Sequence, residues 1–209
     1  MAETATVCPQ LHLPLQSGSN RVLRAMRRGY SVERYLERLA AARAAIQDLA
    51  VTTDLIVGFP GESDADFDET LAAVAAAEFD SAYTFIFSPR SGTRAALMQD
   101  DFVADDVIKE RFERLKEVLD RSALKKHEAR VGRCEEVLVE GPSRRNDAML
   151  SGRTRQGKLI HFAQIGETLR PGALAMVDVV HGAPYHLLGE FVSVVRAPRH
   201  KIRIALRSS

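Results

Sequence analysis

The chain has 209 residues, of which 45% are hydrophobic and 27% charged, and its formal net charge is +1 at pH 7. This composition is ordinary for a soluble protein with one large or two small domains. No apolar run approaches the length of a membrane span, and residues 1–6 lack the basic-then-apolar order of a signal peptide, so we expect a cytoplasmic protein with no membrane partner.

Strands and helices alternate in the first part of the chain. Apolar periodicity, β-branched runs and helix-capping residues predict, in chain order, a strand over Leu11–Gln16, helices over Asn20–Arg28 and Ser31–Asp48, a strand over Thr52–Val57, a helix from Ser63, a strand over Ala82–Phe87 and a helix from Asp105 to about Glu128. Strands that are connected through helices should be parallel. The predicted class of this part is therefore α/β.

Each of the three strands ends in a cluster of Gly, Pro, Ser and one charged or amide side chain. The clusters are His12–Ser19, Ile56–Glu62 and Phe87–Thr93. Parallel α/β sheets and barrels bind ligands at the carboxyl ends of their strands, so the clusters should surround one site. Three strands are too few for a complete barrel. We therefore expect the C-terminal part of a larger enzyme, with further strands preceding this segment.

After Arg130 the pattern changes to short strands without helices. Strands are predicted over Cys134–Glu140, Lys158–Phe162, Ala175–Val180 and His186–Val195, which suggests a small all-β barrel of the oligonucleotide-binding kind. Residues 1–130 carry 17 Lys and Arg against 21 Asp and Glu (−4), whereas residues 131–209 carry 12 against 7 (+5). The basic part is the candidate nucleic-acid binder, although a modest excess of this kind is usually a solvated surface.

Basic residues of the second part fall mainly between the predicted strands. The candidate RNA-binding residues in these loops are Arg144, Arg145, Arg153, Arg155 and Lys158. The tail at 196–209 is also basic and is predicted to be mobile.

Several motifs together resemble one family. The run HLPLQSGSNRVLRAMRRGYS from His12, TDLIVGFPGES from Thr53, FSPRSGT from Phe87, and GRT at 152–154 with HF at 161–162 are similar to the C-terminal half of radical S-adenosylmethionine (SAM) methylthiotransferases. The resemblance extends from Leu11 to about Val195. It implies that residues 1–130 are the C-terminal part of a radical SAM partial (β/α) barrel, 131–195 an OB-like TRAM RNA-binding β-barrel, and 196–209 a basic tail.

The resemblance also implies an activity. The member of the family that these motifs resemble most adds a methylthio group to C2 of N6-isopentenyladenosine at tRNA position 37, using S-adenosylmethionine and [4Fe-4S] clusters. The expected partners are a tRNA anticodon stem-loop and the missing N-terminal half of the enzyme. Cys8 and Cys134 are far apart and lack metal-ligand spacing, so we expect free thiols and no metal ligands in this chain. The isolated chain is then expected to lack radical activity.

By the same resemblance, the strand ends hold the cofactor. Gln16, Ser17 and Ser19 would face its ribose and methionine part, although the alternative for these residues is a turn that caps the following helix. Ile56, Val57 and Gly58 would pack against adenine, with a purely structural turn as the alternative.

Three charged residues complete the candidate set. Glu62 is predicted to hold the loop by accepting hydrogen bonds from backbone N–H groups. Arg90 would meet a carboxylate or an RNA phosphate, or be a plain surface arginine. Asp54 needs a partner if it is buried and is a further candidate, whereas His12 is expected in the core. Phe79, Phe85 and Phe87 are also predicted to be core residues.

Two other functions remain open from the sequence. One is a sister methylthiotransferase that acts on a ribosomal protein aspartate or on threonylcarbamoyladenosine. The other is a non-catalytic RNA-binding fragment that uses only residues 131–195.

Overall fold

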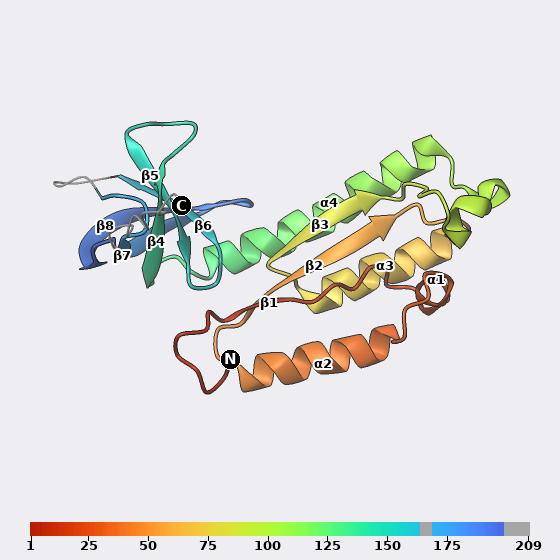
Figure 1. Ribbon diagram of the computed structural model, residues 1–209, viewed down its shortest axis with the longest axis horizontal. Helices are drawn as coiled ribbons and strands as arrows, with labels where there is room; N and C mark the ends of the chain where they lie inside the picture. Colours follow the sequence, from red (N-terminus) through yellow and green to blue (C-terminus); the bar gives the residue numbers. More distant parts are fainter. Residues whose placement is uncertain (164–168, 199–209) are drawn as a thin grey trace, which may run out of the picture. The chain divides into compact units, whose positions relative to one another are not determined.

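The computed structural model describes residues 1–163 and 169–198, and the chain divides into two compact units (Figure 1). The first unit is Met1–Lys126 and the second begins at His127. Most of the predicted basic tail, from residue 199 onward, lies outside the described residues. No helix within the described ranges is long and apolar enough to cross a membrane.

The first unit contains a three-stranded sheet and helices that pack on it. Its elements are β1 (Gln10–His12), α1 (Asn20–Ala25), α2 (Val32–Ala45), β2 (Ala50–Val57), α3 (Asp64–Ala77), β3 (Ser81–Ile86), the 3-10 helices η1 (Arg94–Leu97) and η2 (Gln99–Asp101), and most of α4 (Asp105–Glu128). The strand order is β1-β2-β3, and both pairs are parallel, which confirms the prediction from the crossover rule.

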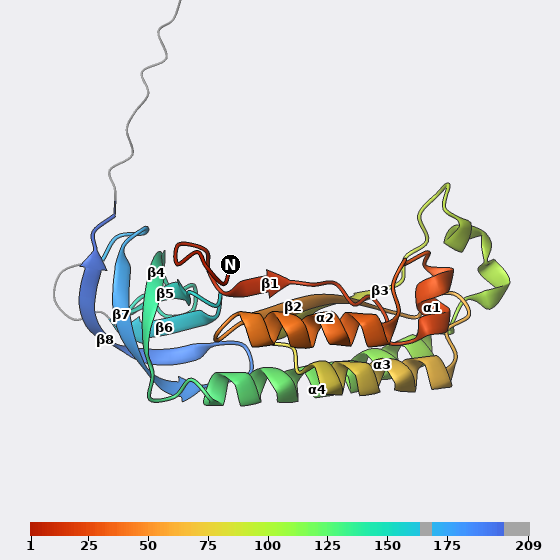
Figure 2. The same ribbon diagram turned by 90° about the horizontal axis from the view of Figure 1, so that it is seen from below.

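One face of this sheet packs against the helices, and the other does not. Figure 2 shows α2, α3 and α4 on the same side of the sheet. Val51, Leu55 and Val57 of β2 point to that side and belong to the buried core. Residues 52, 54 and 56 of the same strand alternate with them and are only partly buried. The second face is therefore the one that can receive a ligand.

Helix starts follow the capping residues that the sequence offers. The Ser31 side chain accepts a hydrogen bond from the Arg34 N–H at 3.3 Å, and Ser63 and Asp66 form a complete capping box at the start of α3. Strand β1 is shorter than predicted. It ends before Pro14, which has no N–H to donate, and Gln16 then makes an isolated parallel bridge with Leu55.

The second unit contains a closed five-stranded barrel. Its strands are β4 (Cys134–Pro142), β5 (Met149–Thr154), β6 (Leu159–Ala163), β7 (Leu174–Gly182) and β8 (Leu187–Arg196), in the order β4-β5-β6-β8-β7. The β6–β8 pair is parallel and the other pairs are antiparallel. Val137, Ile160 and Phe162 are fully buried inside the barrel. The predicted all-β barrel is thus present, with one strand, β5, that the sequence pattern did not reveal.

Two expectations about buried residues were wrong. The His12 side chain is 45% exposed, and its Nδ1 lies 2.9 Å from Thr52 Oγ1. Phe85 is 51% exposed, while Phe79 is fully buried as predicted and Phe87 is partly buried. His12 and Phe85 differ from the prediction because they lie on the sheet face that the helices leave open.

Candidate functional site

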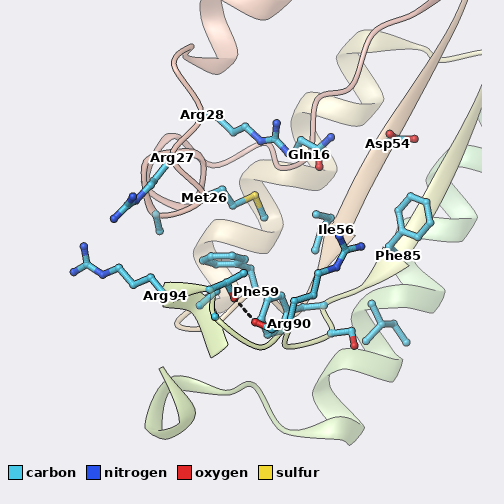
Figure 3. Close-up of a pocket in the computed structure, with 17 residues that line it drawn as sticks. Gln16, Met26, Arg27, Arg28, Asp54, Ile56, Phe59, Phe85, Arg90 and Arg94 are labelled. Carbon is cyan, nitrogen blue, oxygen red and sulfur yellow. Dashed lines mark hydrogen bonds between the residues drawn. The ribbon is translucent and has the colours of Figure 1, made fainter. Parts of the chain in front are cut away.

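A cavity of about 770 Å³ opens at the carboxyl ends of the three strands (Figure 3). Four of the predicted cofactor-binding residues line it: Gln16, Asp54, Ile56 and Arg90. They come from the segment after β1, from β2, and from the segment after β3, so the expected convergence of strand ends takes place. The volume falls within the range of about 300–1,000 Å³ that is typical of small-molecule sites.

Aromatic and aliphatic side chains form much of the cavity wall. Ile56, Phe59, Phe85 and Phe87 line it. The rings of Phe59 and Phe87 are 5.4 Å apart in an edge-to-face arrangement, which fixes both side chains. Such a wall suits the flat face of a nucleobase or an adenine ring.

Arginine side chains surround the cavity in larger number than predicted. Besides Arg90, the lining includes Arg27, Arg28 and Arg94. Arg27 and Arg28 follow α1, and Arg94 begins η1. The sequence pattern gave no reason to group these residues, because the end of α1 and the segment after β3 meet only in the folded chain.

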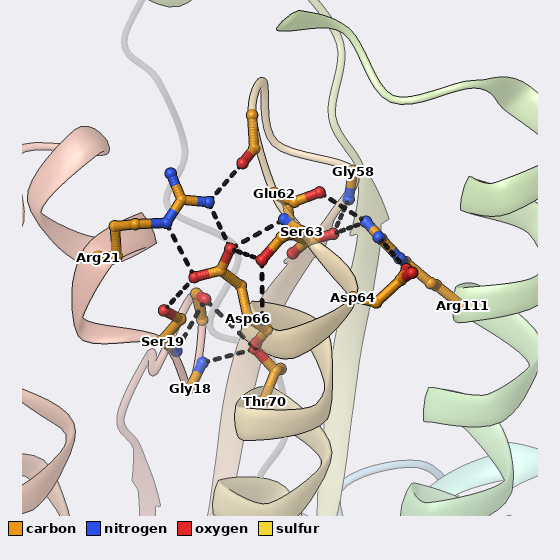
Figure 4. Close-up of polar contacts among 12 residues, drawn as sticks. Gly18, Ser19, Arg21, Gly58, Glu62, Ser63, Asp64, Asp66, Thr70 and Arg111 are labelled. Carbon is orange, nitrogen blue, oxygen red and sulfur yellow. Dashed lines mark hydrogen bonds and ion pairs between the residues drawn. The ribbon is translucent and has the colours of Figure 1, made fainter.

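Ser17 and Ser19 do not line the cavity, and both are buried. Figure 4 shows Ser19 beside Asp66 of α3. Ser19 Oγ donates a hydrogen bond to Asp66 Oδ1 at 2.7 Å, and Ser17 Oγ lies 3.3 Å from Thr70 Oγ1. Their polar groups are thus engaged within the fold, which favours a structural role for these two serines but not the helix-capping role considered as the alternative. Ser19 is the residue before α1, but its side chain makes no capping hydrogen bond.

Asp66 is the centre of this buried network. It accepts hydrogen bonds from Ser19, Ser63 and Arg21, and Arg21 also donates to the Gly61 carbonyl. Burial by itself would raise the pKa of Asp66, but hydrogen bonds from Arg21, Ser19 and Ser63 together hold that pKa well below its usual value. Asp66 therefore remains ionised and fixes the start of α3 against α1.

The loop after β2 is held from the other side by α4. Glu62 Oε2 accepts a hydrogen bond from the Gly58 N–H at 3.0 Å, which confirms the predicted role of Glu62 in holding the loop. Arg111 of α4 pairs with the same carboxylate at 2.9 Å and with Asp64 at 2.7 Å (Figure 4). Burial raises the pKa of Glu62, and the Gly58 N–H and the Arg111 charge oppose that rise.

Val57 and Gly58 also lie away from the cavity lining. Val57 is buried in the core, and a Cβ atom on Gly58 would lie 2.7 Å from Ile108 of α4. Gly58 has φ +76, a conformation that favours glycine. Glycine is required here for the turn and for the close approach of α4, which is the structural alternative considered for this motif.

Asp54 is half-buried and has a partner. His12 Nε2 lies 3.4 Å from Asp54 Oδ2, and both side chains are on the open face of the sheet. Tyr83 lies beside them, with its ring in edge-to-face contact with the His12 ring. Asp54 thus meets the condition that a partly buried carboxylate has a hydrogen-bonding or ionic partner.

The predicted basic residues of the barrel differ in their position, their exposure and their ion-pair partners. Arg144 and Arg145 are exposed in the loop between β4 and β5. Arg153 lies on β5 rather than in a loop, and it pairs with Glu140 at 3.5 Å. Arg155 pairs with Glu136 at 3.3 Å.

Lys158 differs most from the prediction. Its residue exposure is only 6%, so it is not available to a phosphate. The exposed cations of the predicted set are therefore Arg144, Arg145 and Arg153.

Comparison with known proteins first identifies a protein superfamily that part of the chain matches. Residues 1–74 match the model of the radical SAM superfamily. One solved structure, titled "Coproporphyrinogen III oxidase (HemN) from Escherichia coli is a Radical SAM enzyme", aligns with TM-score 0.49 and 18% identity over 81% of this chain and 41% of that chain.

Relatives at much higher identity share a single name, tRNA-2-methylthio-N(6)-dimethylallyladenosine synthase. The protein of this name from Mycolicibacterium vanbaalenii is 50% identical over 91% of this chain and 38% of its own length. Those from Thermobifida fusca and Tropheryma whipplei are 50% and 46% identical and are covered to 39% and 42%. The chain thus spans about two fifths of the length of these relatives, and the resemblance to radical SAM methylthiotransferases is confirmed.

Proposed function

We propose that this chain is part of a tRNA methylthiotransferase that adds a methylthio group to C2 of N6-isopentenyladenosine at tRNA position 37. The observation that carries the proposal is the identity of about 50%, over 91% of this chain, to relatives named for that modified adenosine. The same names favour this substrate over a ribosomal protein or threonylcarbamoyladenosine. Since tRNA is the proposed substrate, we assign the protein to the cytoplasm.

The cavity of the first unit, which we assign to the C-terminal part of a radical SAM barrel, fits S-adenosylmethionine. Ile56 and Phe59 offer apolar contacts to adenine, the Gln16 amide can both donate and accept hydrogen bonds, and the Asp54 carboxylate can accept them from an ammonium or a ribose hydroxyl. When bound, S-adenosylmethionine supplies the radical and the methyl group. The residues of this chain bind and orient it.

Iron–sulfur clusters do not fit the residues of this chain. Such clusters are held by cysteine thiolates, three of them for the cluster that cleaves S-adenosylmethionine. The sequence contains Cys8 and Cys134, which are exposed free cysteines in separate units. We therefore assign no step that involves a cluster to residues of this chain; its ligands belong to the N-terminal half that we propose as partner.

For the barrel we propose a TRAM-type RNA-binding role. Arg144, Arg145 and Arg153 supply exposed positive charge on or beside β5. Binding of a tRNA anticodon stem-loop through phosphates releases counterions, so its affinity should fall as salt rises. Salt-independent binding would contradict this role.

A chimaera tests the complete proposal. The segment of the Mycolicibacterium vanbaalenii relative that matches this chain is replaced by this chain, and tRNA from cells that lack their own enzyme is analysed for methylthiolated adenosine by mass spectrometry. We expect the modified nucleoside to appear. A chimaera that folds and carries its clusters, yet gives only isopentenyladenosine, would refute the proposal.

Substitution of Gln16 by Ala in the same chimaera tests the cavity. Gln16 lies at the cavity, whereas Gln10 of β1 is exposed and outside the lining, so Gln10→Ala is the control. We expect the first variant to raise the S-adenosylmethionine concentration needed for half-maximal rate and the second to leave it unchanged. If both variants need the same S-adenosylmethionine concentration for half-maximal rate, the cavity is not the cofactor site.

A further inference from the structure

Four arginine side chains line the cavity without a partner in the described part of the chain. The guanidinium groups of Arg27, Arg28, Arg90 and Arg94 make no hydrogen bond or ion pair there. Other arginines of the same unit are paired with carboxylates: Arg21 with Asp66, Arg111 with Glu62 and Asp64, and Arg114 with Asp68. We call the four unpaired residues the arginine rim.

The backbone that carries the rim is fixed by hydrogen bonds. The N–H of Arg27 donates to the Arg24 carbonyl at 3.0 Å and that of Arg28 to the Leu23 carbonyl at 2.8 Å. After β3, the Thr93 hydroxyl donates to the Arg90 carbonyl at 2.8 Å, and its N–H donates to the same oxygen at 3.1 Å. The rim is thus presented by two ordered turns.

The two turns approach the cavity from different directions. Figure 3 shows Arg27 and Arg28 coming from the segment after α1, and Arg90 and Arg94 coming from the segment after β3, with the Arg90 side chain extending toward Ile56. Positive charge therefore borders the apolar wall on two sides. This arrangement fits a ligand with a flat ring inside the cavity and negative charges outside it.

The proposed function involves two ligands, S-adenosylmethionine and RNA, and their charges indicate which of them the arginine rim binds. S-adenosylmethionine has one carboxylate, but its ammonium and sulfonium groups make it a net cation, so four arginines exceed what it can use. Asp54, the one carboxylate among the lining residues, is paired with His12. An RNA strand carries one negative charge per nucleotide, and guanidinium groups bind phosphate through two parallel hydrogen bonds.

We propose that the arginine rim binds the phosphates of the RNA strand on either side of the nucleotide whose base enters the cavity. This inference rests on the proposed function and adds a second RNA contact, separate from the barrel. A base must leave its stack before an enzyme can modify it, and holding the neighbouring phosphates keeps the strand in that opened form. Phe85 and Phe87, the aromatic lining residues that are not assigned to S-adenosylmethionine, then supply the stacking surface for the base.

Binding of an RNA stem-loop to the purified chain tests the rim. The probe is a fluorescent anticodon stem-loop that contains N6-isopentenyladenosine, titrated by anisotropy at several salt concentrations. The rim variant changes all four arginines to Gln. A double variant, Arg27→Gln with Arg94→Gln, is compared with the charge-matched control Arg34→Gln with Arg38→Gln, whose side chains are exposed on α2.

Each phosphate contact on a single strand contributes about 0.7 to the slope of log affinity against log salt, so the loss of four contacts should reduce the slope by about 3. The same relation gives a loss of affinity on the order of a hundredfold near physiological salt. The double variant should show about half of the slope reduction expected for the rim variant. The control double variant should keep its affinity within about twofold of the unchanged chain. Circular dichroism verifies that each variant is folded.

The outcomes separate the rim from the proposed function. If the unchanged chain binds the stem-loop and the rim variant binds it equally well, the rim inference is wrong and the proposed function stands. If the unchanged chain does not bind the stem-loop, the rim inference is wrong, and the chimaera assay decides the proposed function separately. Titration with S-adenosylmethionine gives a further arm: loss of its binding in the rim variant, with RNA binding retained, would assign the rim to the cofactor and overturn the inference.

Discussion

Arg111 is expected to be the most important charged residue for the stability of the first unit. Its side chain is 4% exposed and pairs with the Glu62 carboxylate, which is 1% exposed. Changing Arg111 to Met retains the volume but leaves that carboxylate buried without its cation. Removal of one partner from a buried ion pair costs about 3–5 kcal/mol. For a unit of this size, such a loss lowers the melting temperature by roughly 10–20 °C.

Arg114 provides a matched control on the same helix. It too lies over the Phe67 ring and pairs with a carboxylate of α3, Asp68 at 2.9 Å, but both partners are largely exposed. Exposed pairs contribute about 0–1 kcal/mol, so Arg114→Met should lower the melting temperature by only a few degrees. Scanning calorimetry of the full chain measures both variants. A deficit for Arg111→Met no larger than that for Arg114→Met would refute the reasoning.

The pH dependence gives a second check on the same pair. Burial already raises the pKa of Glu62 in the folded chain, and removal of the Arg111 charge raises it further. A carboxyl with a raised folded pKa favours folding while it is protonated, and this contribution is lost as pH rises through the folded pKa. The deficit of Arg111→Met should therefore be larger at about pH 8 than at about pH 5. Adding Glu62→Gln, which keeps an acceptor for the Gly58 N–H, should remove most of that difference.

Three further predictions follow from contacts in the two units. Gly58→Ala should destabilise the first unit by about 1–3 kcal/mol, because the new Cβ would lie 2.7 Å from Ile108 at a φ of +76; calorimetry would show otherwise if its melting temperature were unchanged. Asp66→Asn should be destabilising near neutral pH, and the difference from the parent should disappear as pH falls below about 4 toward the lowered folded pKa, which acid unfolding curves measure. Lys158→Ala should lower the melting temperature of the barrel but leave RNA affinity within about twofold at low temperature, since the residue is 6% exposed; a large loss of affinity in the folded variant would contradict its burial.

Local sequence signals predicted most of the first unit. The Ser31 and Ser63 caps mark the starts of α2 and α3, and the apolar spacing of α4 gave its bounds as the structure has them. These signals suffice because a cap or a buried stripe is determined by neighbours within a few residues. The parallel order of the three strands then follows from the helical connections.

Strand β5 was missed because its sequence lacks the usual strand composition. It includes Ser151, Gly152 and Arg153, and a Cβ on Gly152 would lie 2.4 Å from Val137 Cγ1. Glycine is thus present because the neighbouring strand comes very close, a requirement of the closed barrel and not of the local chain. Arg153 was assigned to a loop for the same reason.

The site was only partly predictable because its remaining members meet through tertiary contacts. Strand ends brought Gln16, Asp54, Ile56 and Arg90 to the cavity, as parallel topology requires. The buried partners of Ser17 and Ser19 lie on α3, some 50 residues further along the chain, so sequence motifs could not show that these serines are already engaged.

The loop over residues 58–62 is anchored on both flanks, by Arg111 from α4 and by Arg21 from α1. Phe59 within this loop is therefore in place before any ligand arrives, and the main loss of motional freedom on association falls on the long exposed arginines. A substitution at Arg21 or Arg111, which lie outside the cavity lining, should consequently weaken ligand capture by loosening the loop that carries Phe59.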